Sequence, residues 1–358
     1  MFRIRMLPAD YGDCLWVEYG SGKKTYRLLI DAGTLAAYKE VRARIEADLP
    51  EKSRFFDLFL ISHIDTDHID TAVKLLNSPS LGLKFGDLWF NGWKQLVDAD
   101  TLGPQQGEYV SALVEEHHIN LNKAWKGKTI VVPDGGKLPR CTLPGRMKVT
   151  LLSPGQEQLR KLRGYWKTLM MDSAGDAKAA LKKLAAAKKY KDVLGKGKMP
   201  DVKSLADRPF EPDNATPNGS SIVVLLEYDG RRCLFAADSH PDVLESGIDR
   251  LLAEEGSTRL KLDALKVPHH GSRHNNSVTL YKKLNCRCYL VSTNGNRFQH
   301  PHAEAIARII QYGGRGVRLF FNYDSEFTRV WDNHELKRRY GYSVTMRTKS
   351  EPSLDIEL

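Results

Sequence analysis

Four apolar, strand-like stretches of this 358-residue chain each end in residues that can bind a metal ion. The densest is FLISHIDTDHIDT at residues 59–71, where two histidines and three aspartates fall within eight consecutive positions. Similar endings occur in CLFAADSH at 233–240, LDALKVPHHGS at 262–272 and YLVSTNGNRFQHPH at 289–302. Imidazoles and carboxylates so crowded would repel one another or lack partners if they were buried without a cation. We therefore expect the four strand ends to meet at a metal site.

A polar turn is the alternative explanation for the first stretch. Asp67 or Asp70 could cap a helix that begins at about residue 70, but capping does not require the two histidines. Each histidine pair taken alone would more often be structural. The coincidence of four such strand ends favours the metal site.

The pattern of strands and helices predicts an α/β fold. Short alternating strand-like runs fill the first sixty residues, with a helical pattern at 34–50 between them. Strand-like and helical runs then alternate as far as about residue 320, which favours two sheets between helices in a single domain over 1–358. Residues of about 156–216 depart from this pattern and predict a lysine-rich helical insertion. Its charged helix is either a solvated face or an arm that follows backbone phosphates.

Composition bears on partners and location. Lysine and arginine total 54 against 44 acidic residues, so the net charge is +10, which raises the odds of an anionic partner such as DNA. Charge alone still slightly favours a protein that is merely basic. Five scattered cysteines do not resemble a disulfide framework. The sequence lacks a signal peptide and any apolar run of about 18 residues, so we expect a cytoplasmic protein without membrane contact.

The motifs SHIDTDHID, LFAADSH, KVPHHGS and FQHPH, in this order, resemble those of the metallo-β-lactamase fold superfamily. More narrowly, they resemble the nuclease domain of ComEC-type DNA-uptake proteins, as do DYGDCLWVEYG, LLIDAGT and NGSSIVVLLEY. The resemblance covers most of residues 1–320 apart from the insertion. It implies a four-layer αββα sandwich with a basic helical insertion, and metal-assisted hydrolysis.

The resemblance also implies roles for individual residues. The metal ligands would be His63, Asp65, Asp67, His68, Asp238 and His269. The catalytic residues would be Asp67, His270 and His300, and the substrate-binding residues Lys266, Ser272 and His302. Asp31 would hold a ligating histidine, although turn formation before Gly33 explains it equally well. Either histidine of the 269–270 pair could be the ligand.

One position departs from the commonest form of the superfamily motif. Asp65 stands where a second histidine is usual, and a carboxylate there shifts the preference from Zn²⁺ toward Mn²⁺ or Mg²⁺. A further histidine found in many members is not evident. Asn91 stands at the matching strand end, and His117 and His118 are typical of a surface helix. The sequence therefore leaves open whether one or two divalent cations bind.

DNA phosphodiester hydrolysis is the expected activity. Trp89, Trp93 and Phe298 could stack on bases or simply pack in the core. Two other functions stay open, because one fold hosts many chemistries. The first is hydrolysis of a small ester, thioester or lactone, and the second is a metal-binding module recruited by protein partners into a larger bacterial assembly.

Overall fold

Strands with two apolar faces dictate the layers of the fold. The computed structural model describes residues 1–22, 24–96, 105–172 and 199–358. In β2 (Leu15–Tyr19), Val17 belongs to the core between the sheets, whereas Trp16 packs on the opposite face. Because successive side chains of a strand point to opposite faces, such a strand must be covered on both sides. Helices α1 (Tyr38–Asp48) and α2 (Thr66–Leu76) cover the Trp16 face.

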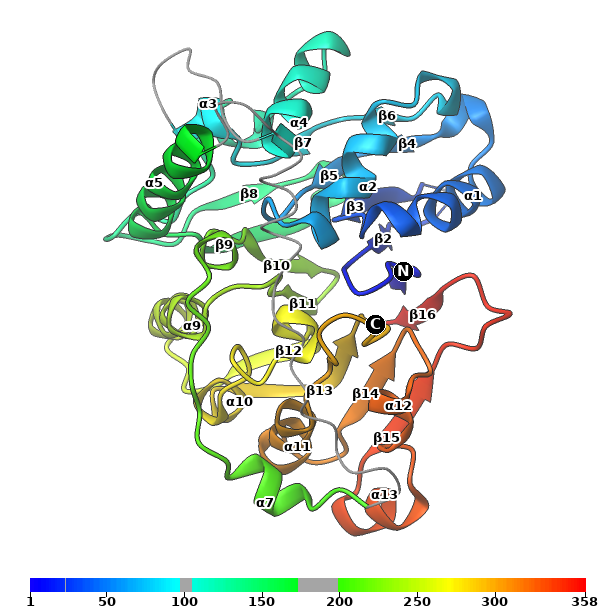
Figure 1. Ribbon diagram of the computed structural model, residues 1–358, viewed down its shortest axis with the longest axis vertical. Coiled ribbons are helices and arrows are strands. Elements are labelled where there is room, and N and C mark those ends of the chain that lie inside the picture. The colour runs from blue at the N-terminus through cyan, green and yellow to red at the C-terminus, as the bar shows by residue number, and fades with distance from the viewer. Residues whose placement is uncertain (23, 97–104, 173–198) are drawn as a thin grey trace.

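The described residues form two large sheets that share one apolar core (Figure 1). The six-stranded sheet has the order β16 (Leu354–Glu357), β1 (Phe2–Met6), β2, β3 (Tyr26–Ile30), β5 (Leu58–Leu60) and β7 (Leu88–Trp89). The eight-stranded sheet has the order β15 (Ser343–Met346), β14 (Arg318–Phe321), β13 (Leu284–Val291), β12 (Leu260–Lys266), β11 (Arg231–Phe235), β10 (Val223–Tyr228), β9 (Lys148–Ser153) and β8 (Arg140–Thr142). A small sheet pairs β4 (Phe55–Phe56) with β6 (Lys84–Phe85).

Helices cover the outer faces of both large sheets (Figure 1). Those of the first half are α1, α2, α3 (Trp93–Leu96), α4 (Gln105–Glu116) and α5 (Gln156–Asp172). Those of the second half are α7 (Val202–Ala206), α8 (Thr216–Gly219), α9 (Pro241–Glu255), α10 (Val278–Lys282), α11 (Ala303–Tyr312), α12 (Glu326–Arg329) and α13 (His334–Tyr340). The predicted α/β class and the αββα arrangement are therefore confirmed. None of the helices in the described ranges has the length and apolarity needed to cross a bilayer.

Parallel pairing places the ligand-bearing loops at one end of the sandwich. Strands β11 to β15 run parallel, as do β3, β5 and β7. The carboxyl ends of neighbouring parallel strands lie at the same edge of a sheet, where α/β folds commonly place their sites. The loops after β5, β11, β12 and β13 are the four ligand-bearing strand ends of the sequence.

The predicted insertion is described only at its two flanks. Residues 176–198, which carry most of its lysines, lie outside the described residues. On one flank, Trp166 of α5 is fully buried, and its ring centroid lies 5.7 Å from that of Trp93. On the other, Val202 and Leu205 of α7 belong to the main core, and α7 packs on α11. Both flanks are thus anchored to the body of the domain.

Candidate metal centre

The loop from β5 into α2 delivers the first group of ligand-type residues. His63 and His68 are buried, and their ring centroids are 4.2 Å apart. Asp65 occupies the N-cap position of α2, but its side chain makes no capping hydrogen bond. Asp67 follows in the first helical turn and is also buried. The Asp65 carboxylate is therefore not used by the helix, although it stands where a capping residue would.

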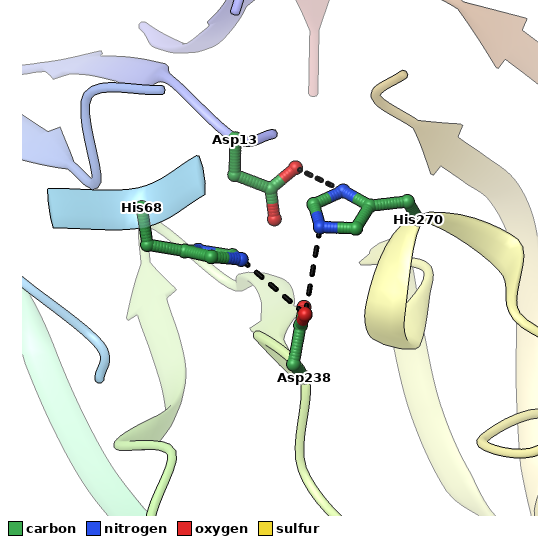
Figure 2. Close-up of side chains that lie close together, drawn as sticks. All are labelled: Asp13, His68, Asp238 and His270. Carbon is green, nitrogen blue, oxygen red and sulfur yellow. Dashed lines mark ion pairs between the residues drawn. The ribbon is translucent and has the colours of Figure 1, made fainter. Parts of the chain in front are cut away.

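Asp238, which follows β11, lies between His68 and His270 and is 2% exposed (Figure 2). Its Oδ2 lies 3.3 Å from Nε2 of His68, 3.5 Å from Nε2 of His269, 3.5 Å from Nε2 of His270 and 4.0 Å from Nε2 of His63. Asp67 Oδ2 lies 3.4 Å from His270 Nε2, and Asp65 Oδ2 lies 3.7 Å from His63 Nε2. The structure thus brings together all six predicted ligands and His270 as well.

Two of the histidines are fixed by acceptors on their outer nitrogens. His68 Nδ1 lies 2.8 Å from Asp31 Oδ2, and His270 Nδ1 lies 2.9 Å from the backbone oxygen of Ser292. A carboxylate and a carbonyl can only accept, so each Nδ1 carries a proton, and in the neutral form of the ring, which is the form that binds a metal, Nε2 carries the lone pair. Asp31 thus holds His68 in the way predicted for a residue behind a ligand.

His63 and His269 also have an acceptor at Nδ1, which for His63 is a serine hydroxyl and for His269 a side-chain amide. His63 Nδ1 lies 3.0 Å from Ser62 Oγ, whose proton is donated to Asp31 Oδ2 at 2.8 Å. Ser62 can therefore accept from His63. His269 Nδ1 lies 2.8 Å from the side-chain oxygen of Asn275. All four imidazoles consequently present bare Nε2 atoms toward Asp238.

These inward-facing atoms match the needs of a divalent cation. Among the described residues, Nε2 of His63, His68 and His270 and Oδ1 of Asp238 are buried without a hydrogen-bond partner. Buried polar atoms in proteins are rarely left unsatisfied, and neutral imidazole with carboxylate is a donor set that Mn²⁺, Zn²⁺ and Mg²⁺ accept to different degrees. Ligand atoms of Asp13, His68, Asp238 and His270 lie within 4.8 Å of one another. The residues present therefore fit a metal.

The centre is closed on one side and reaches solvent on the other. The side chains of His63, His68 and His270 are 0% exposed, whereas those of Asp65, Asp67 and His269 are 32%, 11% and 20% exposed. A substrate must therefore approach over the side formed by Asp65, Asp67 and His269.

Asp13 and Lys266 form a buried ion pair behind the centre. Lys266 is fully buried, with Nζ 2.6 Å from Asp13 Oδ2, and Asp13 Oδ1 lies 3.3 Å from His270 Nδ1. Burial alone would raise the pKa of Asp13, but Lys266 and His270 hold that pKa below its usual range. Lys266 therefore does not reach a substrate, and its predicted phosphate contact is wrong. Asp13 lies in the DYGDCLWVEYG motif of the family resemblance, but the sequence analysis assigned it no role.

Ser272, His302 and His300 were also predicted to act on the substrate, and they differ in whether their polar atoms already have partners. Ser272 is buried, and its Oγ accepts from the backbone nitrogen of His274 at 3.2 Å, which does not fit substrate contact. His302 Nδ1 accepts from the backbone nitrogen of Arg273, and burial lowers the pKa of His302 to about 4. His300 is buried with its ring centroid 5.3 Å from that of His269, and burial lowers its pKa well below the usual value. His300 Nδ1 has no hydrogen-bond partner among the described residues.

Three further expectations concern residues away from the centre. Asn91 exchanges two hydrogen bonds with the backbone of Ile130, so it is a structural residue and not a candidate ligand. Trp89 and Trp93 are buried in the core and cannot stack on bases. His117 and His118 are exposed beyond α4, as expected of surface residues.

His269 is held by residues from the second flank of the predicted insertion. Asp213 Oδ2 lies 3.3 Å from His269 Nδ1 and accepts hydrogen bonds from Nδ2 of Asn218 and Nδ2 of Asn275. Sequence reasoning missed Asp213 because it lies in the segment assigned to the insertion. Its carboxylate makes His269 a better ligand, as outer acceptors of metal-binding histidines generally do.

Asp213→Asn is expected to weaken Mn²⁺ binding by about tenfold while the free energy of unfolding of the metal-free protein changes little, because the amide keeps the shape but not the charge. Calorimetric titration with Mn²⁺ measures the affinity. Asp207→Asn, a change at an exposed carboxylate six positions earlier, serves as the control. Equal affinities for both variants would contradict a role for Asp213.

Gly12 keeps the first ligand loop in place by having no side chain. A Cβ at this position would lie 1.8 Å from the carbonyl oxygen of Asp67. Gly12→Ala should therefore displace the start of α2, lower the free energy of unfolding by about 1–3 kcal/mol and weaken metal binding. Urea denaturation and Mn²⁺ titration test this expectation. Gly164→Ala in α5, where a Cβ would meet nothing within 4 Å, should not destabilise the protein.

Comparisons with known proteins give partial matches. No family model matches the chain. A region of 144 residues, 38% of the chain, is 26% identical to ComE operon protein 3 of Bacillus subtilis (strain 168) and covers 18% of that protein. The chain thus covers less than a fifth of this relative's length.

Solved structures similar to the chain share little sequence with it. The metallo-β-lactamase fold protein YhfI from Bacillus subtilis is 11% identical, with 100% of both chains covered and a TM-score of 0.44. Zn²⁺-bound PqqB from Methylobacterium extorquens is 13% identical, with 100% of both chains covered and a TM-score of 0.43. The short form of human tRNase Z is 11% identical, with 100% of this chain and 99% of that chain covered and a TM-score of 0.45. The fold described above rests on the sheet topology and not on these likenesses.

Proposed function

We propose that the chain is a metal-dependent phosphodiesterase that hydrolyses DNA without sequence preference. The observation that carries the proposal is the convergence of four bare Nε2 atoms and a buried carboxylate on one point, with an accessible side lined by carboxylates. A site of this kind is built to hold cations against an anionic substrate.

The ligand-type residues divide into two groups around Asp238. His68, His270 and Asp67 form the first group, since Asp67 Oδ2 is 3.4 Å from His270 Nε2 and 4.0 Å from His68 Nε2. His63 and Asp65 form the second group, with Asp65 Oδ2 3.7 Å from His63 Nε2. The two groups, together with Asp238 and His269, would supply ligands for one or two cations. His269 and His270 are therefore not exclusive alternatives as ligands, because both histidines face Asp238.

Each residue contributes a distinct part of the proposed hydrolysis. A cation bound here would lower the pKa of a water ligand and offset negative charge on the attacked phosphate. Asp67, whose Oδ2 lies 3.4 Å from His270 Nε2 at the open side of the centre, is placed to orient that water as a hydrogen-bond acceptor. His300, with its unpartnered nitrogen beside His269, is placed to bond an oxygen of the substrate. Asp31 and Asp213 keep the ligating rings in position.

DNA is favoured over other diesters by charge and by resemblance. The net charge of +10 attracts a polyanion, and the lysine-rich residues 176–198 would add to that attraction. The match to ComE operon protein 3 agrees with the ComEC-type resemblance of the motifs. Mn²⁺ or Zn²⁺ is the proposed cofactor, with Mg²⁺ as a further candidate, because carboxylates supply part of the donor set.

The test is incubation of the purified protein with labelled linear and circular DNA in the presence of Mn²⁺, Mg²⁺ or Zn²⁺, beside an Asp67→Ala variant. Metal-dependent degradation that the variant lacks would support the proposal. Turnover of a small ester, thioester or lactone with intact DNA would favour the alternative hydrolase. Metal binding without turnover of any of these substrates would favour a module recruited into a larger assembly.

A further inference from the structure

The guanidinium of Arg297 lies against two aromatic rings, those of Tyr11 and Phe298, near the metal centre. Arg297 donates from Nη1 to the hydroxyl of Tyr11 at 2.8 Å, and its guanidinium carbon lies 5.2 Å from the ring centroid of Tyr11 and 5.1 Å from that of Phe298. The two rings meet edge to face, with centroids 5.8 Å apart. All three side chains are partly exposed, so this Tyr11–Arg297–Phe298 cluster is not part of the core.

The cluster borders the accessible side of the metal centre. Tyr11 precedes Gly12 and Asp13, whose backbone packs on Asp67, with Asp13 nitrogen 3.3 Å from Asp67 oxygen. At the other end, the ring centroid of Phe298 lies 5.8 Å from that of His300, which in turn lies beside His269. The cluster therefore spans from Asp67 to His300 along one rim of the opening.

The two loops that carry the cluster are tied together. The backbone nitrogen of Asn294 donates to the backbone oxygen of Asp10 at 2.9 Å, and the Asn294 side chain donates to the Asp10 carboxylate. The backbone nitrogen of Asp10 donates to the Tyr323 hydroxyl at 2.8 Å. Such ties hold the three side chains in place before a ligand arrives, which reduces the entropy lost on binding.

We propose that Tyr11, Arg297 and Phe298 bind the nucleotide next to the phosphate held at the metal centre, an inference that rests on the proposed function. A guanidinium fixed between rings binds phosphate oxygens with a defined orientation. A partly exposed aromatic ring beside it offers a surface on which any base can stack, so binding needs no particular sequence. The cluster would set the preference for nucleotide esters over simpler diesters.

Two substrates that differ by one nucleoside test the proposal. Thymidine 5′-(4-nitrophenyl phosphate) carries the nucleoside, and methyl 4-nitrophenyl phosphate does not. Arg297→Met and Phe298→Leu should each lower the ratio of kcat/KM for the nucleoside ester to that for the methyl ester by about tenfold. Arg338→Met and Phe55→Leu, which remove an exposed arginine and an exposed phenylalanine elsewhere, should leave the ratio unchanged. An unchanged ratio in the cluster variants would overturn the proposal.

A binding measurement separates failure of this inference from failure of the proposed function. Fluorescence anisotropy with a labelled ten-nucleotide single strand is recorded in EDTA, where metal-dependent turnover cannot occur. The parent protein should bind the strand, and Arg297→Met and Phe298→Leu should each weaken this binding by about tenfold without changing the melting temperature. That result supports the subsite even if no hydrolysis is found. Equal binding by parent and variants, or none by the parent, overturns it whatever the hydrolysis assay shows.

Discussion

Asp238→Asn is expected to abolish tight metal binding and to reduce any metal-dependent hydrolysis by at least about 100-fold. Residues that only orient a ligand already change metal affinity by about 10–100-fold, and Asp238 lies among the ligand atoms themselves. An amide matches the shape of the carboxylate but removes the negative charge that faces four Nε2 atoms. Metal content after dialysis and calorimetric titration with Mn²⁺ measure the loss directly.

Asp242→Asn is the matched control for this substitution. Asp242 is exposed in the first turn of α9, four positions after Asp238. Its replacement by asparagine changes the net charge by the same amount as Asp238→Asn does. It should retain the metal affinity and turnover of the parent protein. Retention of tight Mn²⁺ binding by Asp238→Asn would contradict the central position that we assign to this carboxylate.

Lys266→Met is expected to lower the free energy of unfolding by about 3–5 kcal/mol. The substitution leaves the Asp13 carboxylate buried without its cation, and breaking one side of a buried ion pair carries a cost of this size. Ionised Asp13 is favoured by Lys266 and His270 in the folded protein, which is why its pKa lies below the usual range despite burial. Urea denaturation of the metal-free protein measures the effect.

The double variant Asp13→Asn with Lys266→Met should recover much of that loss, because it removes both charges from the interior. Lys261→Met, at an exposed position of the same strand β12, controls for the loss of a lysine. A single Lys266→Met variant as stable as Lys261→Met would show that the buried pair contributes nothing.

The ligand-type residues at the strand ends could be predicted from local sequence, but the partners of neighbouring polar residues could not. Asp238 and the histidines after β5 and β12 could be expected to meet, because parallel strands end at one edge of a sheet. Asn91 also follows a strand, but its side chain turns to the backbone of Ile130, and strand ends do not reveal such rotations. Lys266 looked available to a substrate because its partner is 253 positions away in the sequence, at Asp13.

Residues that support the ligands were the hardest to predict. Asp213 lies in a segment whose composition suggested an insertion, but its backbone nitrogen donates to the backbone oxygen of His274 at 2.9 Å, and this contact places it beside His269. Asn275 supports the same ring from the loop after β12. A supporting residue needs only one acceptor atom at the right place, so many residue types can serve and no spacing identifies them.

The pairing of β1 with β16 has a consequence for how the chain matures during synthesis. Arg3 pairs with Glu357 and Met6 with Leu354, so the outer edge of β1 stays uncovered until β16 has been synthesised and has paired with it. Ser292 Oγ likewise donates to the backbone oxygen of Gly12, a contact that joins loops made far apart in time. Contacts between residues so distant in sequence form slowly. Metal loading should therefore come late in folding, after β16 has been synthesised and the ligand-bearing loops have been brought together.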